Sequence, residues 1–154
     1  MADIKLAYGT DTNTAITLAG LAHGAARESR YILNSVDLFA DAQLSLVLAL
    51  SNNSIGLDKS IYVYFYAGTA GNYTIPATGT DAALTFVTGS NNLYGPAVIS
   101  VETCSITLKQ TFPSVAAFFG GVLPKEWGFV VYNMCSCAIA SGGHSYRGTY
   151  FTAA

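Results

Sequence analysis

The amino-acid sequence predicts an all-β protein: an antiparallel, jelly-roll-like β-sandwich with one short helical turn and an N-terminal arm. Apolar residues recur at every second position through most of the chain, whereas helical periodicity is nearly absent. Clusters of Gly, Asn and Pro separate these alternating runs at short intervals, which is typical of sandwiches and barrels. We assign residues 1–30 to an arm or edge strand and residues 31–154 to the sandwich domain.

The clearest strand is QLSLVLAL at 43–50, where alternate positions carry the same side chain. Its leucines are Leu44, Leu46, Leu48 and Leu50. Because successive residues of a strand point to opposite faces, all four leucines share one face. Small or polar residues occupy the other face. We therefore expect one buried side, with Leu46 and Leu48 in the core.

Other strands follow the same pattern nearer the C-terminus. We expect them at 84–88 (LTFVT), 127–133 (WGFVVYN) and 146–151 (YRGTYF). The single tryptophan, Trp127, stands at the entry of one of these strands. A large aromatic residue in that position usually anchors the core.

Two irregularities interrupt the strand pattern. In 98–110, VISVETCSITLKQ, the apolar phase slips by one residue, which predicts a bulge or a change of sheet near Glu102 and Thr103. In 112–121, FPSVAAFFGG, a proline precedes a short apolar run and two glycines follow it. This pattern predicts one helical turn.

The segment 60–68, SIYVYFYAG, pairs an aliphatic face that includes Phe65 with a face made only of Tyr62, Tyr64 and Tyr66. Tyrosine offers a large contact area at a low cost in rotamer entropy, so it is enriched at interfaces. We expect Phe65 in the core and the three tyrosines at a subunit contact. Coverage by loops of the same chain and an aromatic platform for sugars are the alternatives.

The first 30 residues differ from the rest, being rich in Ala, Thr and Gly with weak alternation at Ile16 and Leu18. Chain ends of this kind are often ordered only against a partner. We therefore include Tyr8, Ile16 and Leu18 among the predicted subunit-contact residues.

The composition favours an assembled protein. Only 10% of the 154 residues are charged and 51% are hydrophobic, whereas roughly a quarter of an average globular chain is charged. A compact domain with a Ser, Thr, Asn and Gly exterior is the alternative to a surface covered by neighbours. The net charge of −2 and scattered basic residues argue against nucleic acid. We see neither a signal peptide nor an apolar run that could span a membrane.

The chain contains three cysteines, and their spacing does not predict a pair. Cys135 and Cys137 lie two residues apart on one face of an extended segment, where a bridge between them would be strained. We expect all three to be reduced, as in a cytosolic protein. Zinc bound by Cys104, Cys135, Cys137 and His144 has the right ligand count but no recognised spacing, so we predict no metal.

The sequence carries no recognisable catalytic pattern. His23 and His144 lie in Gly-rich stretches where a solvated histidine is the ordinary outcome, and no nucleophile motif accompanies them. Asp37 and Asp41 could hold a calcium ion, yet the spacing of a calcium loop is absent. We predict a structural or binding module with no catalytic residue and no cofactor.

Several stretches, in order, resemble a family of small tailed-bacteriophage virion proteins. They are TAITLAGLAHGAARES (14–29), SVDLFADAQLSLVLAL (35–50), DKSIYVYFYAG (58–68), TGTDAAL (78–84), FPSVAAFFGGVLPKEWGFVVYN (112–133) and YRGTYF (146–151). The likeness spans nearly the whole chain, and its most specific part is the block at 112–133. It departs at 133–143, NMCSCAIASGG, where the family has a polar turn. The resemblance implies a β-sandwich in the virion.

Within a virion, we expect a capsid decoration or cement protein that binds the major capsid protein and copies of itself as a homotrimer. Such a protein needs a compact β domain, an adhesive face and often an arm. The alternative is a tail or head-fibre component whose sandwich binds host surface glycan. Either protein would be assembled in the host bacterial cytoplasm, without nucleic acid or membrane as a partner.

Overall fold

The structure, a computed structural model, describes residues 3–68, 76–86 and 92–153, and it confirms an all-β fold. Strands and one 3-10 turn account for the regular structure of these residues. The strands are β1 (Ile4–Tyr8), β2 (Ala25–Glu28), β3 (Ile32–Leu33), β4 (Asp41–Leu50), β5 (Ser60–Gly68), β6 (Ala83–Leu84), β7 (Leu93–Ser100), β8 (Thr107–Phe112), β9 (Glu126–Asn133) and β10 (Ile139–Ala153). The turn η1 spans Ala116–Phe119.

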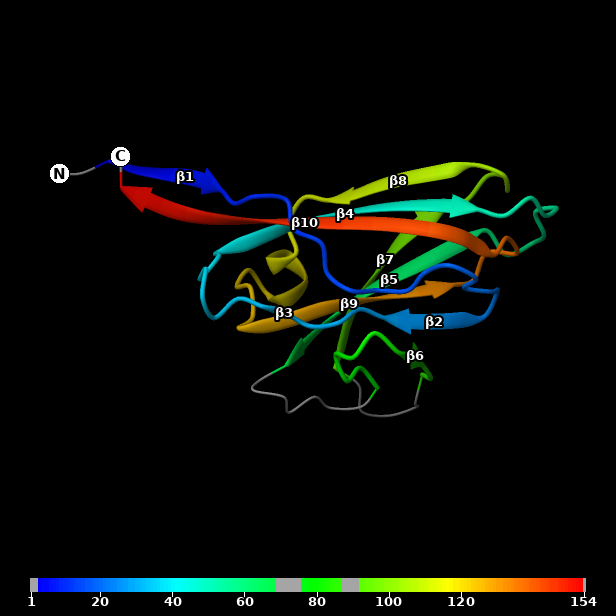
Figure 1. Ribbon diagram of the computed structural model, residues 1–154, viewed down its shortest axis with the longest axis horizontal. Helices are drawn as coiled ribbons and strands as arrows, with labels where there is room; N and C mark the ends of the chain where they lie inside the picture. The colour runs from blue at the N-terminus through cyan, green and yellow to red at the C-terminus, as the bar shows by residue number, and fades with distance from the viewer. Residues whose placement is uncertain (1–2, 69–75, 87–91, 154) are drawn as a thin grey trace.

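Two antiparallel sheets face each other, as Figure 1 shows. One has the order β1-β10-β4-β8 and the other β6-β2-β9-β5-β7, with β3 also paired to β9. The pairing is nested: β1 pairs with β10, β2 with β9, β4 with β8, and β5 with β7. A long hairpin rolled up in this way is the jelly roll, so the predicted architecture holds.

The core fills the space between the sheets, and the alternation in the sequence decides which side chains enter it. All four leucines of β4 are buried there, together with Phe65 of β5 and Trp127 of β9. The four residues predicted as core anchors, Leu46, Leu48, Phe65 and Trp127, each have at most 1% of their surface exposed. Burying one large apolar side chain contributes about 1.5–3 kcal/mol.

The phase slip near Glu102 and Thr103 marks a change of sheet. β7 belongs to the sheet of β5, whereas β8 belongs to the sheet of β4. The chain crosses the sandwich between Ser100 and Thr107, and Val101 and Cys104 are buried on the way. The side chains that point inward therefore change phase because the chain now approaches the core from the opposite sheet.

The predicted helical turn exists but is shorter than the stretch 112–121. It covers Ala116–Phe119 and ends at Gly120, whose φ of 80° lies in the left-handed region that favours glycine. The carboxylate of Asp41 accepts a hydrogen bond from the Ala116 amide at 2.7 Å. This bond satisfies a donor at the start of the turn, so Asp41 has a structural role.

Within residues 3–30, β1 is an edge strand of the first sheet, and the chain then continues onto the body. β1 pairs with the C-terminal end of β10, from Ile4 opposite Ala153 to Tyr8 opposite Thr149, and this two-stranded ribbon projects past the end of the sandwich (Figure 1). We call the ribbon the terminal arm. The residues after it lie on the body, and β2 is an integral strand of the second sheet. Leu18 is buried in the core against β10 near Gly142, which corrects its assignment to a subunit contact.

The cysteines form one disulfide, which corrects the expectation that all three are reduced. Cys104, in the crossover before β8, is bonded to Cys137, in the connection between β9 and β10, with a Cα–Cα distance of 5.7 Å. The two bonded cysteines are 33 residues apart in the sequence. The spacing of Cys135 and Cys137 therefore could not predict this bond. Cys135 is free and buried. The inference of a cytosolic origin from three thiols loses its support.

Candidate interaction surfaces

Among residues 3–68, 76–86 and 92–153, no three His, Cys, Asp or Glu side chains converge to form a metal site. Two cysteines of the zinc alternative, Cys104 and Cys137, form a disulfide with each other, so their sulfur atoms are not free thiolates that could bind zinc. His23 is exposed and lies 3.6 Å from the carboxylate of Asp58. His23 therefore lies beside a carboxylate at the surface, whereas His144 lies elsewhere in the structure.

His144 lies in β10 and is half-buried, which corrects the expectation of a solvated loop histidine. Its Nε2 forms a hydrogen bond with the carbonyl oxygen of Thr14, and its ring lies edge-on to Phe129. Burial lowers the pKa of His144, an effect that the nearby Asp81 opposes. The neutral ring holds the segment after β1 against the body.

Tyr66 is fully buried within its own chain, so its assignment to a subunit contact is wrong. Its hydroxyl donates a hydrogen bond to the Ser29 carbonyl at 2.6 Å. The ring lies on Gly128 of the neighbouring strand β9, where a Cβ atom would collide with it. A second, smaller core surrounds the ring, and its buried members include Ala77 and Leu84.

The other two tyrosines of β5 are half-buried in an aromatic cluster. Tyr62 lies 6.2 Å from Tyr132 and Tyr64 lies 5.4 Å from Phe86, measured between ring centroids. Desolvation, with smaller contributions from the neighbouring tyrosines, raises the pKa of Tyr64. Most of the tyrosine face of β5 is therefore covered by other segments of the same chain.

The segment 76–84 covers the tyrosines because it is fastened to β2. Arg27 donates a hydrogen bond through Nε to the carboxylate of Asp81 at 2.8 Å, and the Thr17 amide donates another at 2.8 Å. Desolvation raises the pKa of Asp81, but the bonds from Arg27 and Thr17 outweigh it and lower the pKa overall. The TGTD stretch quoted above is therefore a structural clamp.

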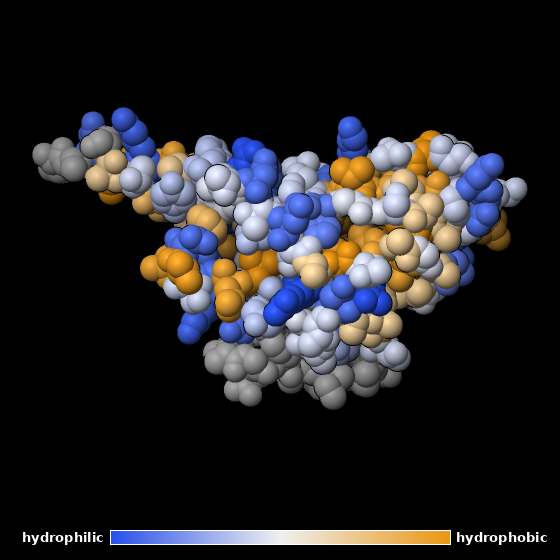
Figure 2. Space-filling view, viewed as in Figure 1, coloured by the Kyte–Doolittle hydropathy of each residue, from blue (hydrophilic) through white to orange (hydrophobic). Residues whose placement is uncertain are grey.

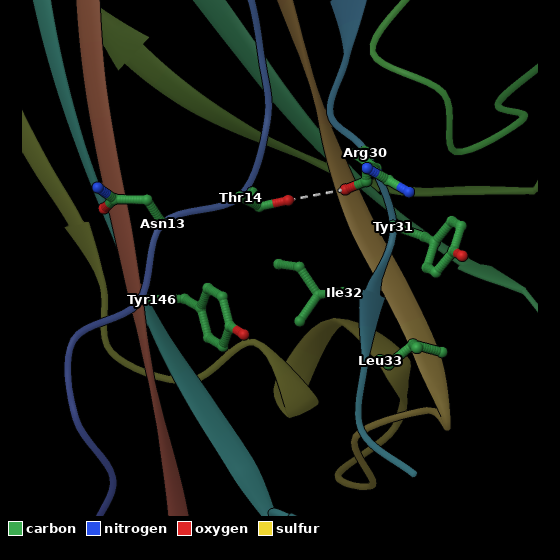
Figure 3. A pocket seen from close by; sticks show the side chains of 7 residues that line it. All are labelled: Asn13, Thr14, Arg30, Tyr31, Ile32, Leu33 and Tyr146. Atoms are coloured by element: carbon green, nitrogen blue, oxygen red, sulfur yellow. Dashed lines mark hydrogen bonds between the residues drawn. The ribbon is translucent and has the colours of Figure 1, made fainter. Parts of the chain in front are cut away.

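A groove of about 300 Å³ runs beside the segment that follows β1 (Figure 3). Its lining residues are Asn13, Thr14, Arg30, Tyr31, Ile32, Leu33 and Tyr146. Figure 3 shows Tyr146 and Ile32 pointing into the groove, whereas Tyr31 and Leu33 point away from it. The Thr14 hydroxyl is already bonded to the Arg30 carbonyl at 3.1 Å.

A second groove, of about 410 Å³, lies at the base of the terminal arm and shares Tyr146 with the first. Its lining also includes Asp37, Phe39 and Tyr150. The ring of Phe39 packs against the backbone of Gly9 and Gly148, because neither glycine has a Cβ to exclude it. This contact fixes the arm where it leaves the sandwich.

One face of the terminal arm is apolar and exposed. Ile4, Leu6 and Tyr8 alternate along β1, and Phe151 stands directly opposite Leu6 on β10. Their exposed fractions are 76%, 52%, 63% and 68%, in that order. Tyr8 is therefore accessible and its subunit contact stays a prediction, whereas Ile16 is half-buried against the core. The alternation of IKLAY could have revealed this face in the sequence.

A second set of exposed apolar residues lies on β3 and on loops at the same end of the molecule, where Figure 2 shows apolar surface below the arm. We call it the arm-end patch, and it consists of Leu33, Val36, Leu38 and Val122, with exposed fractions between 46% and 83%. The Asn34 amide donates a hydrogen bond to the Lys125 carbonyl at 2.8 Å, which brings the two loops together.

The chain matches no protein-family model and no curated protein. The phage resemblance therefore remains an expectation from sequence. Within the described ranges, no helix has the length and apolar character that crossing a membrane requires.

Proposed function

We propose that this chain is a non-enzymatic structural protein of a tailed-bacteriophage virion, a capsid decoration protein that stabilises the shell through contacts between subunits. Its partners are the major capsid protein and copies of itself, with a homotrimer as the expected form. The terminal arm is the observation that carries the proposal. It leaves the side chains of Ile4, Leu6, Tyr8 and Phe151 exposed on one face, which suits a contact with another protein.

The physical argument concerns the stability of the arm in water. An isolated two-stranded ribbon is marginally stable at best, and this one leaves four large apolar side chains exposed on one face. Monomeric proteins seldom expose apolar patches beyond a few hundred Å² unless a partner covers them. With 10% charged residues, the surface also offers little resistance to association.

Fold and sequence add support by analogy. Jelly rolls occur in viral capsid proteins and in lectins, so the architecture is compatible with either role. The resemblance of 112–133 to phage virion proteins favours a role in the virion over a role as a lectin. Assembly would then take place in the host bacterial cytoplasm.

The test compares phage particles with and without this protein. Particles from a phage lacking the gene should release DNA at a lower temperature than wild-type particles. Added purified protein should bind their heads and restore heat resistance. Equal heat resistance of the two particles, together with no binding to the deficient heads, would contradict the decoration role.

A second candidate function is glycan binding as a tail or head-fibre component. The grooves around Tyr146 favour it, because Tyr150 and Asp37 supply an aromatic ring and a carboxylate of the kind that sugars contact. This protein would be scarce in each particle. Purified protein would bind host cells, and Tyr146→Ala would abolish that binding, whereas a decoration protein would leave cells untouched.

A further inference from the structure

We infer that the groove at the base of the terminal arm binds a quaternary ammonium cation, such as a choline headgroup. The inference goes beyond the proposed function, because it assigns a small-ligand site that a contact between shell subunits does not require. The groove has a volume of about 410 Å³, which lies in the range of small-molecule sites. Its lining combines aromatic rings with a carboxylate.

The aromatic rings of the groove stand in a row because of the residue spacing on β10. Tyr146, Gly148 and Tyr150 are alternate residues of this strand, so they point to the same face. Gly148 has no side chain, and the ring of Phe39 fills the space above its backbone. The ring centroids of Phe39 and Tyr150 are 6.0 Å apart. The faces of such rings attract a cation that comes within about 6 Å.

Contacts within the chain hold these rings in place. The ring of Tyr146 stands edge-on to the buried Trp127, with 5.7 Å between centroids. The buried side chain of Asn34 accepts a hydrogen bond from the Phe39 amide at 2.7 Å and donates one to the Phe39 carbonyl at 3.0 Å. A site that is already ordered loses little conformational entropy when a ligand binds.

The charge of the groove favours a cation over an anion. Within the described part of the chain, Asp37 is the only charged residue of the lining, and it forms no ion pair. Burial raises the pKa of the Tyr146 hydroxyl, and the negative charge of Asp37 raises it further, so the carboxylate lies near this ring. Arg147 alternates to the other face of β10, where its guanidinium is paired with Asp11 at 2.7 Å.

A quaternary ammonium suits this lining better than a primary ammonium or a neutral ligand. Its methyl groups pack against aromatic faces and need no hydrogen-bond acceptor, which is how aromatic cages recognise choline. A primary ammonium has three donors to satisfy. A neutral ligand leaves the carboxylate of Asp37 without a counter-charge.

The first experiment titrates the full chain with choline and follows the backbone amides by NMR. We expect saturable shifts at residues of the groove, such as Thr10 and Asp37. The compound 3,3-dimethylbutanol has the shape of choline without its charge, and it should bind about tenfold more weakly or worse. The absence of saturable shifts, or equal affinity for the two compounds, would overturn the inference.

The second experiment locates the site with variants. Asp37→Asn and Tyr150→Leu should each weaken choline binding by about threefold to tenfold. Glu102→Gln and Tyr94→Leu are the matched controls, because both residues are exposed and lie outside the groove. Unchanged melting temperatures would show that the variants are folded. Asp37 is exposed, so Asp37→Asn provides the test even if Tyr150→Leu does not fold. Wild-type affinity in the folded groove variants would overturn the inference.

The remaining arms identify the source of the headgroup and separate this site from the proposed function. Binding to phosphatidylcholine vesicles as well as to free choline would indicate a lipid, and binding to free choline alone would indicate a soluble compound. Tighter binding of lysine amide or methyl glucoside than of choline would overturn the inference, and the glucoside result would support the glycan candidate. Asp37→Asn protein should still bind phage heads, so the choline site and the decoration role can fail independently.

Discussion

The carboxylate of Glu28 accepts a hydrogen bond from the backbone amide of Thr78 at 2.6 Å, within the protein interior. The Thr78 hydroxyl, the Gly79 amide and the Thr80 hydroxyl also donate to it, at 2.6, 3.2 and 3.2 Å. This nest of neutral donors fastens the segment 76–84 over β5. The loop in turn carries Ala77 and Leu84 onto Tyr66.

Glu28→Gln should lower the free energy of unfolding by about 1–3 kcal/mol. The new side-chain NH2 group would face the amides and hydroxyls that donate hydrogen bonds to the Glu28 carboxylate in the wild type. Urea denaturation measures the change. Glu102→Gln is the control, since Glu102 is exposed in the crossover before β8. An equal, small effect in both variants would contradict the clamp.

Tyr66→Phe should cost about 0.5–1.5 kcal/mol of stability, because the buried Ser29 carbonyl loses its hydrogen-bond donor. The substitution should leave oligomerisation unchanged, as the ring is enclosed by its own chain. Tyr94→Phe, on the neighbouring strand and 44% exposed, should be close to neutral. A monomeric but fully stable Tyr66→Phe protein would restore the interface assignment.

The disulfide predicts one titratable thiol per denatured chain before reduction and three after it. Replacing Cys104 and Cys137 together by Ala should lower the free energy of unfolding by about 3–4 kcal/mol, the expected effect of opening a loop of this length. Cys135→Ala, which removes only a buried thiol, should cost about 1 kcal/mol. Three thiols before reduction would show that the bond is absent.

Stability should fall as the pH drops below 6.5, the usual pKa of histidine. Burial lowers the pKa of His144 in the folded chain, so the unfolded chain binds the proton at a higher pH. The stabilising effect of the neutral ring is complete above 6.5 and is lost as the pH falls through the depressed folded value.

The measurement is urea denaturation between about pH 7 and pH 5, the range where histidine titrates. His144→Gln should flatten the dependence in this range, whereas His23→Gln should retain it. A wild-type protein with equal stability across the range would refute the assignment. Asp81 has a lowered pKa, so its contribution disappears at more acidic pH, below its usual value of 3.8.

Gly148→Ala should destabilise the base of the arm by about 1–3 kcal/mol, because the new Cβ would collide with the ring of Phe39. Gly143→Ala lies on the same strand but meets only Val47, at 3.9 Å, so it should be neutral. Limited proteolysis should cut the arm faster in Gly148→Ala alone. Equal cutting in both variants would exclude Phe39 as the anchor.

The sequence predicted the features that depend on local periodicity. The leucines of β4 and the change of sheet near Glu102 follow from alternation within one segment, and each lies as expected. The turn at 112–121 was also predictable, because Gly120 marks its end. Such features need no knowledge of which strands are neighbours.

Features that depend on distant segments were missed. Alternation places Tyr66 on the outer face of β5, but only the clamp between Glu28 and Thr78 shows that this face is covered. The bond from Cys104 to Cys137 likewise needs the crossover and the β9–β10 connection to meet. The arm requires both chain ends to pair, which no local pattern reveals.

The most direct test of the central claim is a cryo-electron microscopy reconstruction of an intact phage particle. Our account predicts density for this jelly roll at many equivalent positions on the capsid surface. Absence of the chain from purified particles, or its confinement to a few copies at the tail, would contradict the account.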